Sequence, residues 1–276
     1  MKIALCLYGY FNNRADNNAG MKGYDYIQKN IVDKINGELD IFIHSWEPKL
    51  KQTIKNLYNP KKSIYEKQKN FTKDIELYGV NENWINEGFD RNSTIYKQCT
   101  IQASLGFFYS RATSIALKCS YEELNNFNYD CVIVVRFDLG QRSGWHKGYN
   151  VSLIKFNPKL DMNYIYSAMW KQLNAGFCDQ WFFSNSENID LLGDMYLNSI
   201  SDYFLPNSNY YKAITNGWKD SNANDQFSNE FFKKNKSENL VKYPKWQMIN
   251  NHILHKWHFM QTGLYEKSKF LGDVKI

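Results

Sequence analysis

The sequence predicts an α/β fold, with a mostly parallel central sheet and helices on its faces. Its clearest feature is the apolar run 131–135, whose four β-branched residues are typical of a strand buried on both faces. Two similar runs stand at 2–10 and 40–48, and a long helical pattern at 96–124 leads into the central run. Strands that alternate with helical patterns indicate parallel strands joined by helical crossovers.

Composition and charge narrow the class of protein. The chain has 276 residues, of which 43% are hydrophobic, so it can bury a substantial core. The formal net charge is +6, with short lysine clusters at 49–51, 61–62 and 233–236 that we interpret mainly as solvated faces. No arginine-rich tract or zinc-finger spacing is present, so we expect no nucleic-acid partner. The charge allows a peripheral position at an anionic membrane surface.

The cysteines and the N-terminus indicate the compartment. The five cysteines form no Cys-x-x-Cys pair and are odd in number, as expected of reduced thiols in the cytoplasm. The first apolar run is short and ends at Gly9 without a cleavage site, so it is typical of a strand rather than of a signal peptide. No apolar window has the length needed to cross a bilayer. We therefore expect a cytoplasmic protein without a transmembrane segment.

The remaining elements are shorter. The histidines at 252, 255 and 258 recur every third residue, so a helix would bring them near one another. The polar stretch 49–91 is weakly periodic, and we expect short helices and loops in it with one edge strand. In chain order, we expect a helix at 24–35, that edge strand near 75–77, strands at 164–167 and 176–184, a helix at 188–200 and an N-capped helix at 222–232.

Polar residues follow three of the predicted strands at their carboxyl ends, which is where open α/β sheets bind ligands. Gly9 ends the first strand and His44 lies near the end of the second. Arg136 and Asp138 close the central strand, and being two apart they share one of its faces. The alternative for Arg136 and Asp138 is an ion pair that merely closes the strand. The alternative for His44 is a hydrogen-bonded structural residue.

Taken in order, these pieces resemble a family of glycosyltransferases from bacterial surface-polysaccharide clusters and large viruses, which have a GT-A-like nucleotide-sugar fold. The resemblance spans roughly residues 2–200. It implies a single GT-A-like (Rossmann-like) domain over 1–276, with a nucleotide-binding part at about 1–145 and an acceptor-side part at about 146–276. The matching series is Leu7–Gly9 with Arg14, 40–46, the long helix leading into 129–130, 136–139, and 179–182 followed by a helix.

The resemblance implies transfer of a sugar from a nucleotide-diphosphate-sugar donor to a hydroxyl of a glycan or polysaccharide acceptor. Mn²⁺ or Mg²⁺ would take oxygen ligands from Asp138 and the phosphates, with His255 as a further ligand. If the reaction inverts the configuration at the anomeric carbon, a general base is needed, which would be Asp179 or Asp225; we prefer Asp179 because it belongs to the matching series. The residues implied to lie beside the donor are Tyr8, Gly9, Arg14, His44, Arg136 and Asp138.

One departure from the family bears on the metal. GT-A enzymes commonly carry Asp-x-Asp, whereas this chain has Arg136-Phe137-Asp138. A guanidinium in place of a carboxylate removes a ligand and adds a positive charge. Either Asp138 holds the metal weakly, or Arg136 and Arg14 replace it. Two other functions stay open, namely transfer of a phosphoryl-type group onto a polysaccharide and non-catalytic carbohydrate binding.

Overall fold

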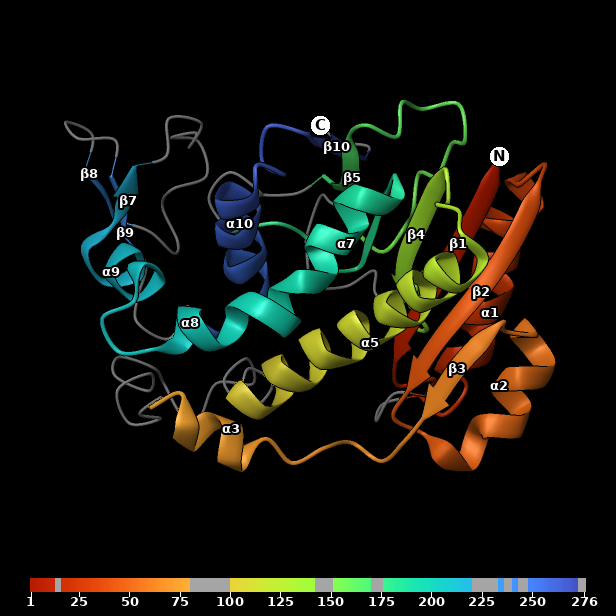
Figure 1. Cartoon of the computed structure of the whole chain (residues 1–276), viewed down its shortest axis with the longest axis horizontal. Coiled ribbons are helices and arrows are strands. Elements are labelled where there is room, and N and C mark those ends of the chain that lie inside the picture. Colours follow the sequence, from red (N-terminus) through yellow and green to blue (C-terminus); the bar gives the residue numbers. More distant parts are fainter. Residues whose placement is uncertain are drawn as a thin grey trace.

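The computed structural model describes residues 1–12, 16–79, 100–141, 151–169, 176–219, 233–235, 240–242 and 248–272. Its main sheet has seven strands in the order β10-β5-β6-β4-β1-β2-β3 (Figure 1). Every neighbouring pair is parallel except the two pairs that involve β6. The predicted α/β class and the mostly parallel sheet flanked by helices are therefore confirmed.

The strands of this sheet are β1 (Lys2–Gly9), β2 (Glu38–Ser45), β3 (Lys62–Tyr65), β4 (Cys131–Arg136), β5 (Ile165–Ala168), β6 (Trp181–Ser184) and β10 (Ser268–Leu271). The helices are α1 (Ala19–Asn30), α2 (Lys51–Tyr58), α3 (Thr72–Leu77), α5 (Ile101–Asn125), α7 (Ser186–Asp194), α8 (Ile200–Phe204), α9 (Asn209–Asn216) and α10 (Asn251–Thr262). Short helical turns are η1 (Val32–Lys34), η2 (Pro48–Leu50) and η3 (Met195–Ser199). Three further strands, β7 (Trp218–Lys219), β8 (Lys233–Asn235) and β9 (Leu240–Lys242), form a small separate sheet.

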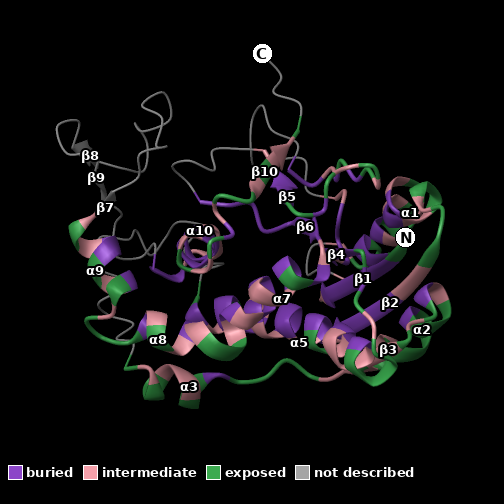
Figure 2. Cartoon of the chain, turned by 45° about the horizontal axis from the view of Figure 1, so that its top comes forward, coloured by how far each residue is buried: buried purple, intermediate pink, exposed green. Residues whose placement is uncertain are grey.

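The central strands are buried on both faces, which is why they read as continuous apolar runs (Figure 2). Leu5 and Leu7 of β1 point to a cluster that includes residues of α1 and α2. Cys6 and Tyr8, on the opposite face, belong to a cluster that includes residues of α5 and α7. The sheet is thus the middle layer between two helical layers, and only its edges are available for a site.

Helix α5 is the longest described helix, and it lies against β1, β2 and α7 (Figure 1). Its first turn is capped by Thr100, whose side chain accepts a hydrogen bond from the Ala103 N–H. It ends at Asn126, which has the left-handed φ of 53° that favours a helix stop. The long helix predicted at 96–124 is confirmed over the described residues, and it carries Ser110 and Arg111 beneath the sheet edge discussed below.

Some predicted elements differ from the structure. The edge strand expected at 75–77 is wrong, because these residues belong to helix α3 and the edge strand is β3. Ile75 packs against a cluster that includes Phe71 of the preceding turn and residues of α5, while Leu77 is exposed. The helix expected at 24–35 begins earlier, as α1, and ends earlier. The helix expected at 222–232 lies outside the described residues.

The described part of the chain contains no helix with the length and apolar character needed to cross a membrane. Its four cysteines (Cys6, Cys119, Cys131 and Cys178) are all free thiols, as expected, and Cys99 lies outside the described residues.

Candidate functional site

The candidate site lies at the sheet edge where β1 and β4 end side by side. The chain runs from β1 outward to β2 and β3, whereas β4 pairs with the other side of β1. This reversal is a topological switch point, which is the usual ligand-binding place of an open α/β sheet. Tyr8 and Arg136 are partners in the register of β1 and β4. The predicted residues Gly9 and Arg136 thus lie at two adjacent strand ends.

Gly9 ends β1 with backbone geometry that only glycine adopts easily. Its φ is +98°, and no described atom lies within 4 Å of the place where a Cβ would stand. Its N–H donates to Ser110 Oγ at 2.9 Å, and its carbonyl accepts from the Trp46 N–H at 3.2 Å. Helix α5, through Ser110, and the residue that follows β2, Trp46, thus hold the strand end. The space beside the Gly9 Cα is open to a ligand.

Arg136 and Asp138 form an ion pair at the end of β4. Arg136 Nη2 donates to Asp138 Oδ2 at 2.7 Å, and the two side chains are 19% and 4% exposed. Burial alone would lower the pKa of Arg136, but Asp138 and Asp179 together raise it above its usual value. The guanidinium therefore stays positively charged. Both the ion-pair alternative and the donor-contact prediction are compatible with this geometry.

The turn that carries Asp138 is fixed by a close helix contact. Helix α1 packs against it at Gly23, where a Cβ would lie 1.8 Å from the Phe137 carbonyl oxygen. Any larger residue at this point would push α1 and the turn apart. The same glycine weakens the helical pattern of the sequence, which explains why the start of α1 was predicted too late.

Asp179 reaches the same edge from the other side of β4. Strand β6 is antiparallel to β4 and begins there, with Trp181 opposite Val135. The Tyr8 hydroxyl donates to the backbone carbonyl of Asp179 at 3.1 Å, which ties this segment to β1. Burial raises the pKa of Tyr8, so the phenol remains a donor at neutral pH.

Two nitrogen-bearing side chains lie near the Asp179 carboxylate. Gln180 Nε2 donates to its Oδ1 at 3.4 Å, and His252 Nδ1 lies 3.9 Å from the same oxygen. The Asp179 side chain is 9% exposed. His252 itself is oriented by Phe177, whose carbonyl oxygen lies 2.8 Å from Nδ1. His252 was predicted only as part of a histidine cluster, and its place beside Asp179 depends on a contact across 73 positions of the sequence that periodicity does not reveal.

His44 is placed in the second layer behind Gly9. It is fully buried, with Nδ1 2.6 Å from Ser110 Oγ and Nε2 3.1 Å from Glu66 Oε1. Because the Glu66 carboxylate can only accept, we assign the ring hydrogen to Nε2, so that Nδ1 accepts from the Ser110 hydroxyl. Burial lowers the pKa of His44 despite the nearby Glu66, which keeps the ring neutral. Both ring nitrogens are engaged, so the position supports the structural alternative rather than direct contact with a donor.

His255 lies away from solvent in α10. It is fully buried, and its Nε2 forms a contact with Nη1 of Arg111. Burial and then the Arg111 charge hold the pKa of His255 well below its usual value. A guanidinium stands where a bound cation would have to be, so the metal-ligand prediction for His255 gains no support. Two further predicted site residues, Arg14 and Asp225, lie outside the described residues.

The described donor set at the sheet edge does not fit Mg²⁺ or Mn²⁺ well. These ions prefer several oxygen ligands in a near-octahedral arrangement. Asp138 is bonded to the Arg136 guanidinium, and Asp179 faces an amide and an imidazole. The positive charge at this edge therefore comes from Arg136.

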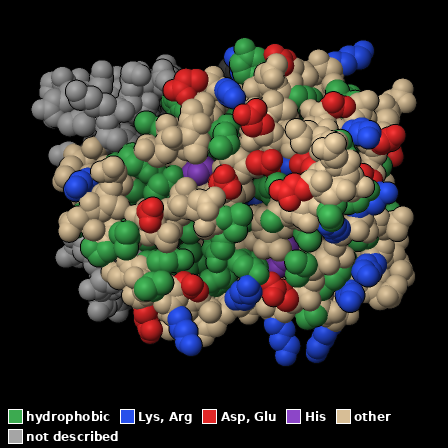
Figure 3. Space-filling view, viewed as in Figure 1, with side chains coloured by type: hydrophobic (Ala, Val, Ile, Leu, Met, Phe, Trp, Pro, Cys, Tyr) green, Lys and Arg blue, Asp and Glu red, His purple; other side chains and the backbone are tan. Residues whose placement is uncertain are grey.

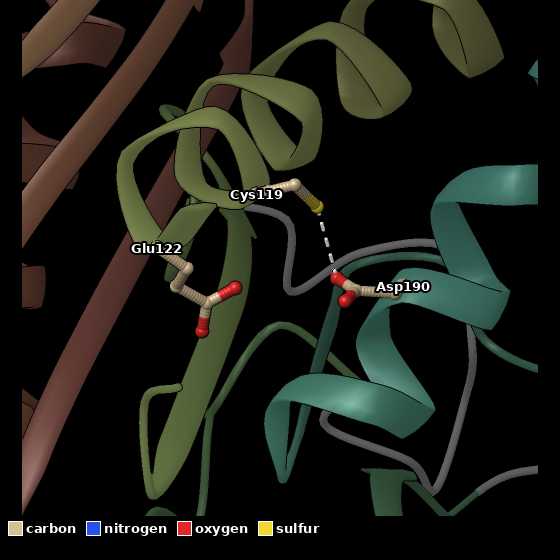
Figure 4. A group of neighbouring side chains, drawn as sticks. All are labelled: Cys119, Glu122 and Asp190. Carbon is tan, nitrogen blue, oxygen red and sulfur yellow. Dashed lines mark hydrogen bonds between the residues drawn. The ribbon is translucent and has the colours of Figure 1, made fainter. Parts of the chain in front are cut away.

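A possible acidic metal-binding group lies elsewhere. Cys119, Glu122 and Asp190 have ligand atoms within 4.8 Å of one another, and Cys119 Sγ donates to Asp190 Oδ1 at 3.1 Å (Figure 4). Glu122 also accepts from the Tyr129 N–H at 2.7 Å, which places the group at the opposite end of β4 from the candidate site. The buried Lys118 ammonium donates to both Glu122 and Asp190 and already supplies a cation there.

Comparison with known proteins adds little to this geometry. No family model matches the chain, and no curated protein matches it. A solved structure, the apo crystal structure of mouse xyloside xylosyltransferase 1, matches over 98% of this chain and 84% of that chain. The identity is 11% and the TM-score is 0.36. This is a weak structural likeness to one glycosyltransferase, and at this score it carries no argument about activity.

Proposed function

We propose that the chain is a glycosyltransferase that moves a sugar from a nucleotide-diphosphate-sugar donor to a hydroxyl of a glycan or polysaccharide. The observation that carries the proposal is the gathering of Arg136, Asp138 and Asp179 at the β1/β4 switch point, beside the open backbone of Gly9. In the proposal, the nucleotide-binding part is about 1–145 and supplies Arg136, while the acceptor-side part is about 146–276 and supplies Asp179.

The donor side follows from charge. The diphosphate leaving group gains negative charge as its bond to the sugar breaks, and a fixed cation must stabilise it. Arg136 is that cation, since a guanidinium can bind phosphate oxygens in a bidentate manner. Asp138 holds Arg136 in place before the donor binds. No step in this scheme is routed through Mn²⁺ or Mg²⁺, because the described residues do not assemble their ligands.

The acceptor side follows from proton transfer. The acceptor hydroxyl oxygen forms a bond to the anomeric carbon, the bond from that carbon to the phosphate oxygen breaks, and the diphosphate leaves with the electron pair. The hydroxyl proton passes to the Asp179 carboxylate as general base. Gln180 donates to this carboxylate, and the His252 ring lies 3.9 Å from it. Asp225 stays the alternative base.

Turnover of nucleotide-sugars tests the proposal. A panel of uridine, guanosine, cytidine and thymidine diphosphate sugars is incubated with the chain and a mixture of glycan acceptors, and release of the nucleotide is measured. We expect release with at least one donor, and a loss of 100-fold or more on Asp179→Asn, the usual scale for removing a general base. Asp33→Asn is the matched control, because Asp33 is an exposed carboxylate in η1. Binding of a sugar without turnover would instead support the non-catalytic alternative.

A further inference from the structure

The positive charge of the chain is concentrated in one segment. Residues 49–73 contain eight of the 34 basic residues and only one of the 28 acidic ones, Glu66. The segment therefore carries a formal charge of +7, whereas the rest of the chain sums to −1. We call its lysines the lysine face; they are Lys49, Lys51, Lys55, Lys61, Lys62, Lys67, Lys69 and Lys73.

The lysine face is continuous and accessible. It runs from η2 through α2 and β3 to the start of α3, along one side of the molecule (Figure 1). Figure 3 shows several basic side chains along the lower border of the view, where this segment lies, with some acidic side chains beside them. All eight lysines are exposed except Lys62, which is partly buried and donates to Ser120 Oγ at 2.9 Å. Such a surface creates a positive potential that extends about one Debye length into solution.

These lysines are largely without acidic partners. Among the described residues, a carboxylate lies within ion-pair distance of only one of them, Lys61, which is 3.4 Å from Asp40. On α2, Ile54 and Tyr58 face the core, while Lys51 and Lys55 stand four residues apart on the exposed side. Like charges at this spacing repel one another. Lysines at an edge strand can also serve to prevent aggregation through that edge. This second explanation applies to Lys61 and Lys62, which lie at β3, but not to the lysines on η2 and α2.

We propose that the lysine face docks on the surface of an anionic phospholipid bilayer. The segment contains no arginine, the residue best suited to bidentate recognition of bases and phosphates. Of its three aromatic rings, those of Tyr58 and Phe71 are buried and that of Tyr65 is partly buried, so none is fully available to stack on bases. Lysine ammonium groups act as point charges and attract anionic headgroups without a required geometry. Ile64, 38% exposed on β3, adds apolar surface within the face. This inference is independent of the proposed activity.

Co-sedimentation of the full chain with lipid vesicles tests it. At about 0.1 M salt, we expect binding to phosphatidylcholine vesicles that contain phosphatidylglycerol and none to phosphatidylcholine alone. Each lysine near the surface is worth about fivefold in affinity, so removing four should weaken binding by about 100-fold or more. The test variant combines Lys49→Gln, Lys51→Gln, Lys55→Gln and Lys67→Gln. The control with the same change in net charge combines Lys29→Gln, Lys34→Gln, Lys159→Gln and Lys212→Gln, all exposed and outside the face.

The outcomes separate cleanly. Loss of binding in the test variant with little change in the control, and retention when the same four lysines are changed to Arg, support the proposal. An equal loss in both glutamine variants would mean that net charge alone is responsible, and it would overturn the proposal. So would the absence of binding to anionic vesicles, or tighter binding to a duplex DNA than to those vesicles. Thermal melting of each variant checks that it is folded.

Discussion

Ser110 connects the buried His44 to the backbone of the candidate site, and its removal gives a well-defined prediction. The change Ser110→Ala takes away the acceptor for the Gly9 N–H and the donor to His44 Nδ1. His44 is fully buried and cannot recruit solvent easily, whereas Gly9 is partly exposed and can. An unsatisfied buried polar group costs about 1–3 kcal/mol, so we expect the free energy of unfolding to fall by about 2–3 kcal/mol.

Urea denaturation measures this change. The control is Ser114→Ala, one turn further along α5, because Ser114 is also fully buried but donates only to the Arg111 carbonyl of its own helix. That loss should cost less than about 1 kcal/mol. If Ser110→Ala is no more destabilising than Ser114→Ala, the hydrogen-bonded chain from Glu66 to Gly9 does not stabilise the sheet edge as described. A second readout is nucleotide affinity, which should weaken in Ser110→Ala because Gly9 is less firmly held.

Two other predictions concern buried charges. Burial lowers the pKa of His258 to about 4, so the unfolded chain takes up its proton first as pH falls, and the free energy of unfolding should drop by about 2 kcal/mol between pH 7 and pH 5 through this residue. His258→Gln should flatten that pH dependence in urea titrations, and an unchanged slope would contradict the assignment. Lys118→Met leaves the buried Glu122 without its cation and should cost about 3–5 kcal/mol. In this variant Cys119, Glu122 and Asp190 are free to bind a metal ion. Zn²⁺ should therefore raise the melting temperature of the variant and leave that of the wild type unchanged. Equal effects on both proteins would refute the idea that the Lys118 ammonium takes the place of a metal ion.

Local sequence patterns revealed the layers of the fold because the central strands are buried on both faces. The runs that form β1 and β4 are nearly pure apolar segments, β2 has an apolar centre at 41–43, and α5 has no proline and a long helical period. Strand β3 is not predictable from the sequence, because Lys62–Tyr65 is a short, half-exposed edge strand of mixed polar and apolar residues. The positions of Gly9, Arg136 and Asp138 at strand ends are predictable because the end of a buried strand is visible in the sequence.

The contacts that organise the site were not visible in the same way. Ser110 lies 66 positions from His44, and Glu66 lies 22 positions away, so no local pattern links them. The role predicted for His255 as a ligand came from the family resemblance, and neither it nor the spacing of the histidines shows that Arg111 contacts the ring. Sequence patterns predict where strands end. The hydrogen-bond partners of each polar side chain depend instead on which helices, distant in the sequence, pack against that strand end.

Calorimetric titration with uridine and guanosine diphosphate in the presence of EDTA tests the central claim, that Arg136 is the cation for a diphosphate at the β1/β4 edge. We expect binding by the wild type and a loss of about tenfold or more on Arg136→Gln, as for removal of a charge-assisted hydrogen bond. Asp138→Asn should bind at least as tightly as the wild type, because it removes a carboxylate that competes for the same guanidinium. Unchanged affinity in Arg136→Gln, or binding that appears only when Mn²⁺ is restored and disappears in Asp138→Asn, would contradict the account.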